Sequence, residues 1–349
     1  MKNKVCTGID VGRSATKAVS IVDGVRAMIS FPSAICPAIR LTDASAAARA
    51  QVETVKIGSH EYFTGETAII QGRDEMLGGL SDDWASSEQH GALILAAIKR
   101  LEAQGIAGVA TGLVVVGLPA RVFASQRKHY AAAVSELLPE AEVKVVPQPM
   151  GPYYTMLFDE SGMEQGGVDS GSWAFIEVGQ FTTDFAMIER GHVVERAFNS
   201  CEGMRVSAEA LQRLVMERYG LSISMAEATA LLQEPLIRNF GRKIDVTDLV
   251  REAVQPLART IAEKARQMFG ETLRSMDGVR LAGGGAGLVM DALPSVWSGL
   301  TGVVPEGFIA VVDDARFAVA DGFGRFGLAF DVYRRSRAQA ARAIETASA

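Results

Sequence analysis

The sequence predicts an α/β protein made of two duplicated lobes, because of its length, an internal repeat and three glycine-rich loops. Its 349 residues are too many for one hydrophobic core and predict about two domains at roughly 150 residues each. The composition, 48% apolar and 22% charged, excludes a disordered, collagen-like or coiled-coil chain. We therefore expect a globular protein with two cores.

The net charge and the cysteine content further limit the class of protein and the compartment in which it is expected. The net charge of −6 argues against a protein that mainly binds nucleic acid directly, since such domains are usually strongly basic. Cys6, Cys36 and Cys201 lie far apart without metal-ligand spacing, so we expect free thiols in a reducing compartment. The apolar start of the chain is broken at Asp10, unlike a signal peptide. Residues 103–120 are uncharged but rich in glycine, so we expect a cytoplasmic protein without a membrane segment.

The internal repeat aligns residues 9–17 with residues 176–184 without a gap, at an offset of 167 residues. In each copy an apolar strand (5–9 and 172–176) ends in a carboxylate, one further residue and a glycine. A hydroxyl-bearing loop leads to a second strand (17–22 and 184–188), and a tight turn, Asp-Gly or Arg-Gly, leads to a third (25–29 and 193–198). The repeat predicts two lobes about a pseudo-twofold axis. The alternative is two unrelated hairpins that share turn chemistry.

The repeated loops have the composition of a site for a polyphosphate and Mg²⁺. Glycine lets backbone N–H groups approach phosphate oxygens, Ser and Thr add donors, and a carboxylate holds the hydrated metal. A lysine adds a compact positive charge. The first loop supplies Asp10, Gly12, Ser14, Thr16 and Lys17, and the second supplies Glu177, Gly179, Gln180, Thr182 and Thr183. Facing copies would hold the β- and γ-phosphates from both sides.

A third glycine cluster, Gly283, Gly284 and Gly285, follows a short predicted strand at 279–282 and precedes an apolar, helical stretch at 288–293. Adjacent glycines at such a turn allow close approach to a flat ligand or a phosphate. No Gly-Lys-Ser/Thr follows them, so this is not a P-loop. An ordinary strand-to-helix turn is the alternative reading.

Together these three motifs resemble the phosphate-1, phosphate-2 and adenosine motifs of the actin-like ATPase superfamily. Three further stretches resemble its plasmid-segregation branch, the ParM/StbA type: 114–119, which ends in Gly-Leu-Pro, 56–66 and 315–322. The resemblance covers roughly residues 4–330. It implies the bilobed fold of actin and the chaperone ATPases, with a nucleotide cleft between the lobes.

The resemblance also implies roles for individual residues. Asp10 and Glu177 would lie around Mg²⁺, Lys17 on the phosphates and the three late glycines beside adenosine. Gln148 falls where the family positions the attacking water, and would align that water in phosphoryl transfer. The alternative for Gln148 is a polar turn residue between two prolines.

Three departures from the family pattern concern the same loops. Arg13 stands where actin has a phosphate-binding serine, so the guanidinium itself or a neighbouring hydroxyl must serve. Glu177 replaces the usual aspartate, and Gln180 with Phe181 replaces a smaller pair. These changes predict slow hydrolysis with nucleotide binding retained.

The expected domain boundaries follow from the repeat. Lobe I would span 1–167, with a core of 1–30 and 88–167 and a small subdomain at about 31–87. Lobe II would span 168–349, with a core of 168–204 and 276–330, a helical subdomain at about 205–275 and a tail at 331–349. Helices are predicted at 88–104, 124–138, 202–219 and 245–270, and another should begin with Ser224 as its cap.

The function implied is a polymerising actin-like ATPase that binds ATP or GTP with Mg²⁺. It would assemble head-to-tail with copies of itself and act in plasmid DNA segregation through a DNA-binding adaptor, without contacting nucleic acid or a membrane itself. Two alternatives stay open on the same fold. One is a small-molecule kinase or phosphatase, for which no catalytic aspartate stands out, and the other is a non-polymerising nucleotide-dependent switch.

Overall fold

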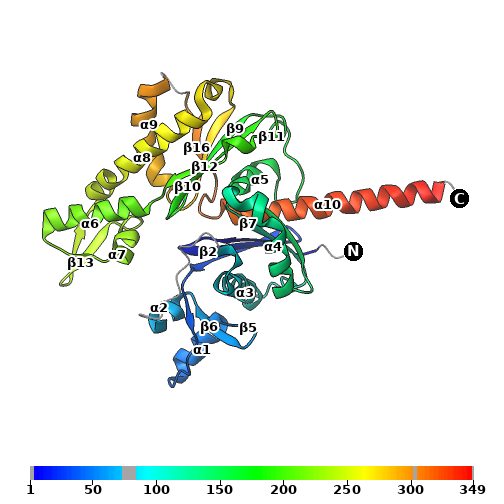
Figure 1. The fold of residues 1–349 in the computed structure, drawn as a ribbon, viewed down its shortest axis with the longest axis horizontal. Coiled ribbons are helices and arrows are strands. Elements are labelled where there is room, and N and C mark those ends of the chain that lie inside the picture. The colour runs from blue at the N-terminus through cyan, green and yellow to red at the C-terminus, as the bar shows by residue number, and fades with distance from the viewer. Residues whose placement is uncertain (1–3, 73–83, 302–304, 348–349) are drawn as a thin grey trace. The chain divides into compact units, whose positions relative to one another are not determined.

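The structure is a computed structural model that describes residues 4–72, 84–301 and 305–347. The chain forms two compact units (Figure 1). The first comprises Met1–Asp169 together with Phe317–Ala349, and the second comprises Ser170–Arg316.

The first unit is built on a five-stranded sheet in the order β3-β2-β1-β7-β8. Strands β1 (Cys6–Val11), β2 (Ala15–Val22) and β3 (Val25–Pro32) form an antiparallel meander. Strands β7 (Leu113–Leu118) and β8 (Glu142–Pro147) extend the sheet parallel to β1. The β2–β3 turn has positive φ at Asp23 (50°) and Gly24 (78°), as a type I′ hairpin turn requires.

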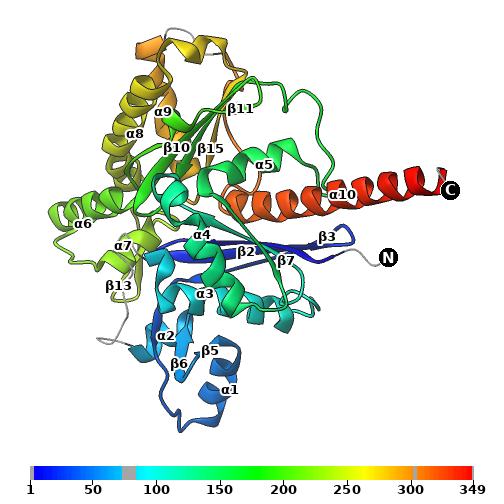
Figure 2. The same cartoon turned by 45° about the vertical axis from the view of Figure 1, so that its right-hand side comes forward.

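Helices cover both faces of this sheet (Figure 2). Helices α3 (Glu88–Ala103) and α4 (Ala120–Leu137) pack on one face, and α5 (Gly151–Leu157) and α10 (Ala318–Ala347) pack on the other. Because side chains alternate along a strand, Val114 and Val116 join the core with α3, whereas Leu113 and Val115 join the core with α10. A strand buried on both faces must be apolar throughout, as β7 is.

A small three-stranded sheet lies between β3 and α3 in the sequence. Its strand order is β4 (Ile35–Pro37), β6 (His60–Thr64) and β5 (Thr54–Ile57), with helices α1 (Ala44–Glu53) and α2 (Glu66–Gly72) beside it. The carboxylate of Asp43 caps α1 by accepting a hydrogen bond from the backbone N–H of Ala46 (2.6 Å). These elements occupy the expected small subdomain, of which residues 73–83 lie outside the described part of the chain.

The second unit repeats the topology of the first. Its sheet has the order β11-β10-β9-β15-β16, formed by β9 (Trp173–Val178), β10 (Thr182–Glu189), β11 (His192–Val193), β15 (Gly278–Ala282) and β16 (Ile309–Val311). Strand β15 runs parallel to β9, as β7 does to β1. The turn after β10 has φ of 49° at Arg190 and 76° at Gly191, almost the values found 167 residues earlier. Two matching sheets confirm the duplicated α/β architecture that the repeat predicts.

The third strand of the second copy differs from the prediction of a continuous strand at 193–198. Strand β11 ends at Val193, a 3₁₀ turn occupies Glu195–Ala197, and β12 (Asn199–Glu202) then pairs with the opposite end of β10. The turn interrupts the ladder because Val194 N–H still bonds to Met187 while the next residues curl away.

Most of the remaining second unit is helical, with α6 (Arg205–Tyr219), α7 (Met225–Leu231), α8 (Thr247–Phe269) and α9 (Ala286–Thr301). The predicted cap is present, since the Ser224 side chain accepts from the backbone N–H of Glu227 (3.1 Å). A hairpin that the sequence reasoning missed, β13 (Leu236–Asn239) with β14 (Arg242–Asp245), separates α7 from α8. Helix α8 continues through Pro256.

The end of the chain corrects the expected domain boundary. The repeat predicts residues 317–349 as part of lobe II, but they belong to the first unit, and the expected tail is part of the single helix α10. Val319 and Phe323 of this helix are buried against the sheet of the first unit. Close packing is possible because Gly8 in β1 has no side chain: a Cβ there would lie 2.6 Å from the Cβ of Phe323.

Candidate functional site

A buried carboxylate stands at the end of β1. Asp10 is 4% exposed, and its Oδ2 pairs at 2.9 Å with the Nζ of Lys17, the residue opposite it on β2. Its other oxygen, Oδ1, accepts a hydrogen bond from the Nε2 of Gln148 (3.1 Å). Burial and the charge of Asp10 raise the pKa of Tyr130. The first unit therefore brings together three of the residues that the sequence assigned to one site.

The parallel strands of the sheet bring Gln148 close to Asp10. It opens a 3₁₀ turn directly after β8, and the turn comes close to the neighbouring β7. A Cβ at Gly117 would lie 2.7 Å from the Cγ of Gln148. Any larger residue at position 117 would therefore displace this glutamine.

The loop after β1 is held by a residue that the sequence reasoning missed. The hydroxyl of Ser33 donates to the carbonyl of Gly12 and lies 2.9 Å from the Oγ1 of Thr16. The backbone N–H of Ser33 also bonds to the carbonyl of Ser14 (3.0 Å). Ser33 could have been found by counting the hairpin register from the Asp-Gly turn, which places Pro32 opposite Ala15.

The side chains of this loop divide into internal and exposed ones. Thr16 is fully buried and its hydroxyl contacts Ser33, so it shapes the loop. Arg13 and Ser14 are exposed at the tip. Gly12 is required for the bend, because a Cβ there would lie 2.8 Å from the carbonyl oxygen of Ala15.

The second loop repeats this geometry in the second unit. A Cβ at Gly179 would lie 2.8 Å from the carbonyl oxygen of Thr182, matching Gly12 and Ala15. Glu177 lies opposite Asp184 in the β9–β10 ladder, as Asp10 lies opposite Lys17. The acid–base pair of the first copy thus becomes a pair of carboxylates in the second.

Hydrogen bonds tie the second loop to the start of α6. The backbone N–H groups of Met204 and Arg205 donate to the carbonyls of Gly179 (3.0 Å) and Gln180 (2.7 Å). Gly203, which the sequence reasoning missed, permits this contact, since a Cβ there would lie 2.6 Å from the Gly179 carbonyl oxygen.

The side chains of the second loop have their own partners. The Thr183 hydroxyl donates to the carbonyl of Glu202 (2.9 Å), the Thr182 hydroxyl to the Oδ2 of Asp184 (3.0 Å), and the Gln180 Nε2 to the Oγ1 of Thr229 (3.2 Å). Thr183, like Thr16, is fully buried. These two threonines occupy equivalent places in the repeat, and each fixes the loop to a neighbouring segment.

The third loop packs against the second within the same unit. Gly283 has a φ of 89°, and a Cβ there would collide with the carbonyl oxygen of Val178. The N–H of Gly285 donates to that same oxygen (3.1 Å). A Cβ at Gly284 would meet no atom within 4 Å, so this position faces open space. The second unit therefore joins two of the three predicted motifs at the end of β9.

The residues present fit a hydrated magnesium ion. Both oxygens of Asp10 accept a hydrogen bond, from Lys17 and Gln148, yet each retains lone-pair capacity for a metal-bound water. Magnesium prefers oxygen donors and keeps most of its water. In the described part of the chain no cluster of three or more His, Cys, Asp or Glu residues is placed to hold a metal.

Comparisons with known proteins agree with this architecture. A family model described as the N-terminal domain of actin-like proteins matches residues 8–151. A second, described as the C-terminal domain of the archaeal MreB-like actin homologue, matches residues 175–295. The chain belongs to the actin-like superfamily, as its motifs indicated, and has the actin-like fold.

Solved structures show the same fold at low sequence identity. Alp7A, an actin-like protein, is 14% identical with a TM-score of 0.72, covering 96% of this chain and 98% of its own. A ParM from a 15-stranded filament of Clostridium botulinum is 19% identical with a TM-score of 0.70, covering 93% and 99%. The archaeal actin homologue Ta0583, solved in complex with ADP, is 22% identical with a TM-score of 0.68, covering 92% and 98%. A comparison with curated proteins finds no match.

The described helices were also compared with the requirements of a membrane span. None of them is both long enough and apolar enough to cross a bilayer.

Proposed function

We propose that this chain binds a nucleoside triphosphate with Mg²⁺, hydrolyses it slowly and assembles with copies of itself in response. The observation that carries the proposal is the duplicated carboxylate-x-Gly loop. It stands at the same strand end in two sheets of identical topology, at Asp10–Gly12 and Glu177–Gly179. The adenosine-type glycines adjoin the second copy.

The two units would contribute different chemistry to nucleotide binding. In the first unit, Asp10 orders the water shell of the metal while Lys17 supplies positive charge for the phosphates. In the second unit, Glu177 is a carboxylate of the kind that a hydrated metal requires, and Gly179 offers backbone approach to a phosphate. Gly283 to Gly285 would lie against the nucleoside, where Gly284 leaves space.

Binding is tested with Asp10→Asn, which keeps the shape of the side chain and removes its charge. We expect the affinity for Mg-ATP to fall by at least about tenfold, because an amide holds a hydrated magnesium ion less well than a carboxylate. Asp321→Asn is the matched control, since Asp321 of α10 is equally buried (3% exposed) and pairs with Arg26 of β3 and Arg325 of α10. Titration with a fluorescent ATP analogue measures both. Equal affinities for Asp10→Asn and wild type would remove Asp10 from the metal site.

Hydrolysis is assigned to water positioned by Gln148. Catalysis of phosphoryl transfer rests on positioning and charge, and a displacement of about 1 Å costs roughly 10²-fold in rate. We expect Gln148→Ala to bind Mg-ATP almost as wild type does while phosphate release slows by about that factor. If both quantities fell together, Gln148 would be a support for Asp10 and not a positioning residue for water.

Self-assembly is the second half of the proposal. Support comes from the fold shared with a ParM that forms a filament and from the acidic chain, which suits a filament that engages DNA through an adaptor protein. Sedimentation and light scattering with Mg-ATP or Mg-GTP, against ADP and no nucleotide, test it. A protein that stays monomeric with every nucleotide at high concentration would refute assembly. Phosphate transfer to a small-molecule acceptor would instead favour a kinase.

A further inference from the structure

The β13–β14 hairpin ends in an unusual turn. Asn239 pairs with Arg242, so Phe240 and Gly241 alone form the two-residue loop. Both have positive φ, 45° at Phe240 and 82° at Gly241, which defines a type I′ turn. Asn-Gly or Gly-Gly is preferred there, and a bulky residue with positive φ is an outlier that costs conformational energy. Such strain is typically retained at positions that serve binding or catalysis.

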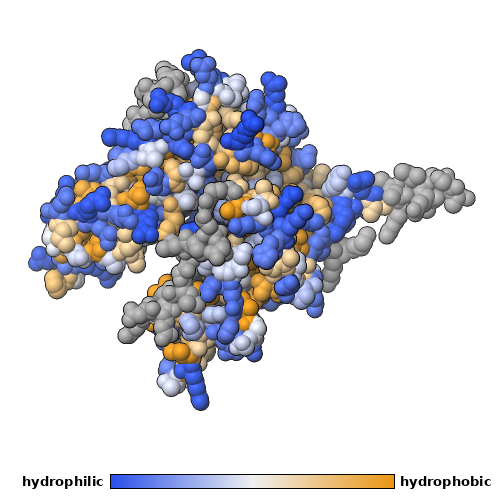
Figure 3. Space-filling model, viewed as in Figure 1, coloured by the Kyte–Doolittle hydropathy of each residue, from blue (hydrophilic) through white to orange (hydrophobic). Residues whose placement is uncertain are grey.

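The side chain of Phe240 is also entirely exposed, at 101% of its reference area. Its strand neighbours Ile237 and Ile244 face the core of the second unit, where Ile237 is 3% exposed and Ile244 packs against the same cluster. The hairpin thus packs its isoleucines into the core of the second unit and presents an aromatic ring at its tip. Apolar surface occurs among charged side chains over the region of this hairpin and α6 (Figure 3).

Three cationic residues flank Phe240 in the sequence. Arg238, Arg242 and Lys243 form no ion pair with any residue that the structure describes. An exposed aromatic side chain flanked by cations has the composition of a binding anchor, in which the ring fills an apolar pocket and the charges meet acidic groups at its rim.

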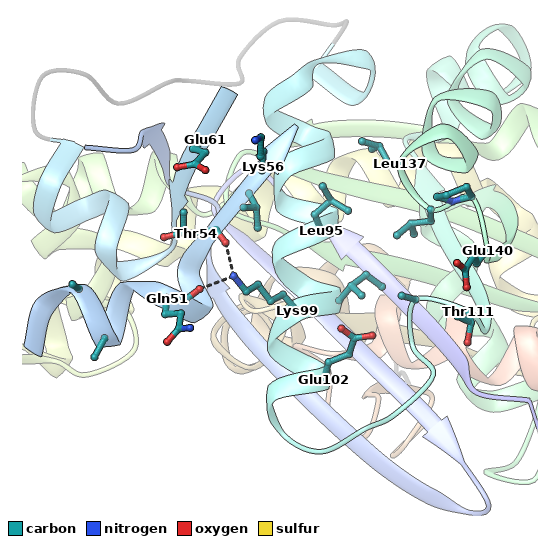
Figure 4. Close-up of a pocket in the computed structure, with 17 residues that line it drawn as sticks. Gln51, Thr54, Lys56, Glu61, Leu95, Lys99, Glu102, Thr111, Leu137 and Glu140 are labelled. Atoms are coloured by element: carbon teal, nitrogen blue, oxygen red, sulfur yellow. Dashed lines mark hydrogen bonds between the residues drawn. The ribbon is translucent and has the colours of Figure 1, made fainter. Parts of the chain in front are cut away.

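The first unit contains a groove with the complementary features (Figure 4). Its volume is about 960 Å³, and its lining comes from α1, β5, β6, α3, the end of α4 and the segments that follow α3 and α4. Val55, Leu95 and Leu137 supply apolar lining. A groove of this size is at the upper end of pockets that hold drug-sized ligands, so it can accommodate a hairpin tip.

Acidic side chains stand at the edge of the groove. Glu61, Glu102 and Glu140 are exposed lining residues, and none pairs with a cation among the residues described. Of the two lysines in the lining, Lys99 donates to the carbonyls of Gln51 (2.6 Å) and Thr54 (2.8 Å) (Figure 4). Lys56 is the other. The three unpaired carboxylates match the three unpaired cations of the hairpin.

We propose that the hairpin tip of one copy docks in this groove of a second copy, with Phe240 as the anchor. The proposal rests on the self-assembly proposed above and names the surfaces that make it. The hairpin and the groove are different surfaces of the same chain, so the contact is heterologous and can be repeated from copy to copy.

The first experiment uses directed disulfide formation between two different variants. Both variants also carry Cys201→Ser, because Cys201 is partly exposed and could form unwanted disulfides. Cys6 and Cys36 are kept, because both are buried. One variant carries Phe240→Cys and the other Leu95→Cys, and because neither has both new thiols, only an intermolecular contact links them. A disulfide requires Cα atoms within about 7 Å. The matched control replaces Phe240→Cys by Val25→Cys, because Val25 is 61% exposed and follows the two-residue Asp23-Gly24 hairpin turn of the first unit.

We expect the Phe240→Cys and Leu95→Cys mixture with Mg-ATP to give at least about tenfold more crosslinked dimer than the control. Equal yields would overturn the docking proposal. The assay is also run at high protein concentration without nucleotide, so it decides even if wild-type protein forms no polymer. Self-assembly and the docking contact can therefore fail separately.

A second experiment measures what the contact contributes. Phe240→Ala should raise the critical concentration for assembly by at least about tenfold, as loss of a buried aromatic anchor does, while Mg-ATP affinity stays at the wild-type value. Val25→Ala is the control and should change neither quantity. An unchanged critical concentration for Phe240→Ala would overturn the proposal.

Charge reversal identifies the occupant of the groove. A variant with Glu102→Lys and Glu140→Lys should assemble poorly alone, and so should one with Arg238→Glu and Arg242→Glu. Mixing the two should restore assembly, because the reversed hairpin of one variant then meets the reversed groove of the other. If mixing restores nothing while the groove variant still loses assembly, another partner occupies the groove and the hairpin assignment is wrong.

Discussion

Replacing Lys17 by methionine should destabilise the first unit, because it removes the partner of a buried carboxylate. The ammonium group lies 2.9 Å from the Oδ2 of Asp10, and the two side chains are 14% and 5% exposed. At an effective dielectric constant near 20, two unit charges at this distance attract by about 6 kcal/mol. After the substitution the carboxylate stays buried and, among the residues that the structure describes, keeps the side-chain hydrogen bond from Gln148 alone.

The net cost is smaller than the gross attraction, because the lysine is partly hydrated and regains solvation in the unfolded chain. Removing one partner of a buried ion pair typically lowers the free energy of unfolding by about 3–5 kcal/mol. Because Lys17 is partly exposed, we expect a loss of about 3 kcal/mol for this pair. For a unit of roughly 200 residues, that corresponds to a fall in melting temperature of about 6–12 °C.

Hydrogen exchange of β1 and β2 is the suitable assay, since the two units need not unfold together. Asp10→Asn added to Lys17→Met should recover part of the lost protection, because the uncompensated charge is gone and the amide still accepts from Gln148. Wild-type protection in Lys17→Met, or no recovery in the double variant, would refute the ion-pair reasoning.

Two further predictions concern the first unit. His90 is buried against Tyr130, 2.8 Å from its hydroxyl, and burial lowers the pKa of its imidazole to about 3. Because the unfolded chain binds this proton near pH 6.5 and the folded chain does not, stability should fall as pH drops from about 6.5 towards 3, by at most about 1.4 kcal/mol per pH unit. The free energy of unfolding, measured with urea at several pH values, should fall less steeply with decreasing pH in His90→Gln than in wild type. An identical pH dependence would assign the acid sensitivity to other groups. Gly322→Ala should displace α10 from α5, because its Cβ would collide with the backbone of Gly151. We expect a loss of about 1–3 kcal/mol, measured by thermal unfolding, whereas Gly324→Ala, whose nearest neighbour would be a side-chain methyl group at 3.3 Å, should cost less.

Much of the site could be read from local patterns. The Asp23-Gly24 and Arg190-Gly191 turns predict hairpins because positive φ is a property of the residues at the turn itself. Once such a turn is placed, register follows by counting. Lys17 then comes opposite Asp10 and Asp184 opposite Glu177.

Other parts of the site depend on residues that are distant in the sequence. Ser33 and Gly203 carry no local motif, yet each leaves space for, or bonds to, a loop that the motifs identified. Gly117 belongs to the Gly-Leu-Pro stretch, but its contact with Gln148 could not be read from that stretch. The 3₁₀ turn Glu195–Ala197 that breaks the third strand of the second copy also has no counterpart in the first copy.

The sequence by itself determined the duplicated α/β framework and its glycine turns, because alternation of side chains and backbone freedom act within a few residues. Tertiary structure alone decided which sheet receives α10, since this helix lies outside both copies of the repeat. The absence of a side chain at Gly8, and the space it leaves for the backbone of α10, selects the first unit. Likewise, only the fold showed that Phe240 faces solvent while Ile237 is buried, because a four-residue strand is too short for its pattern to reveal which side is covered.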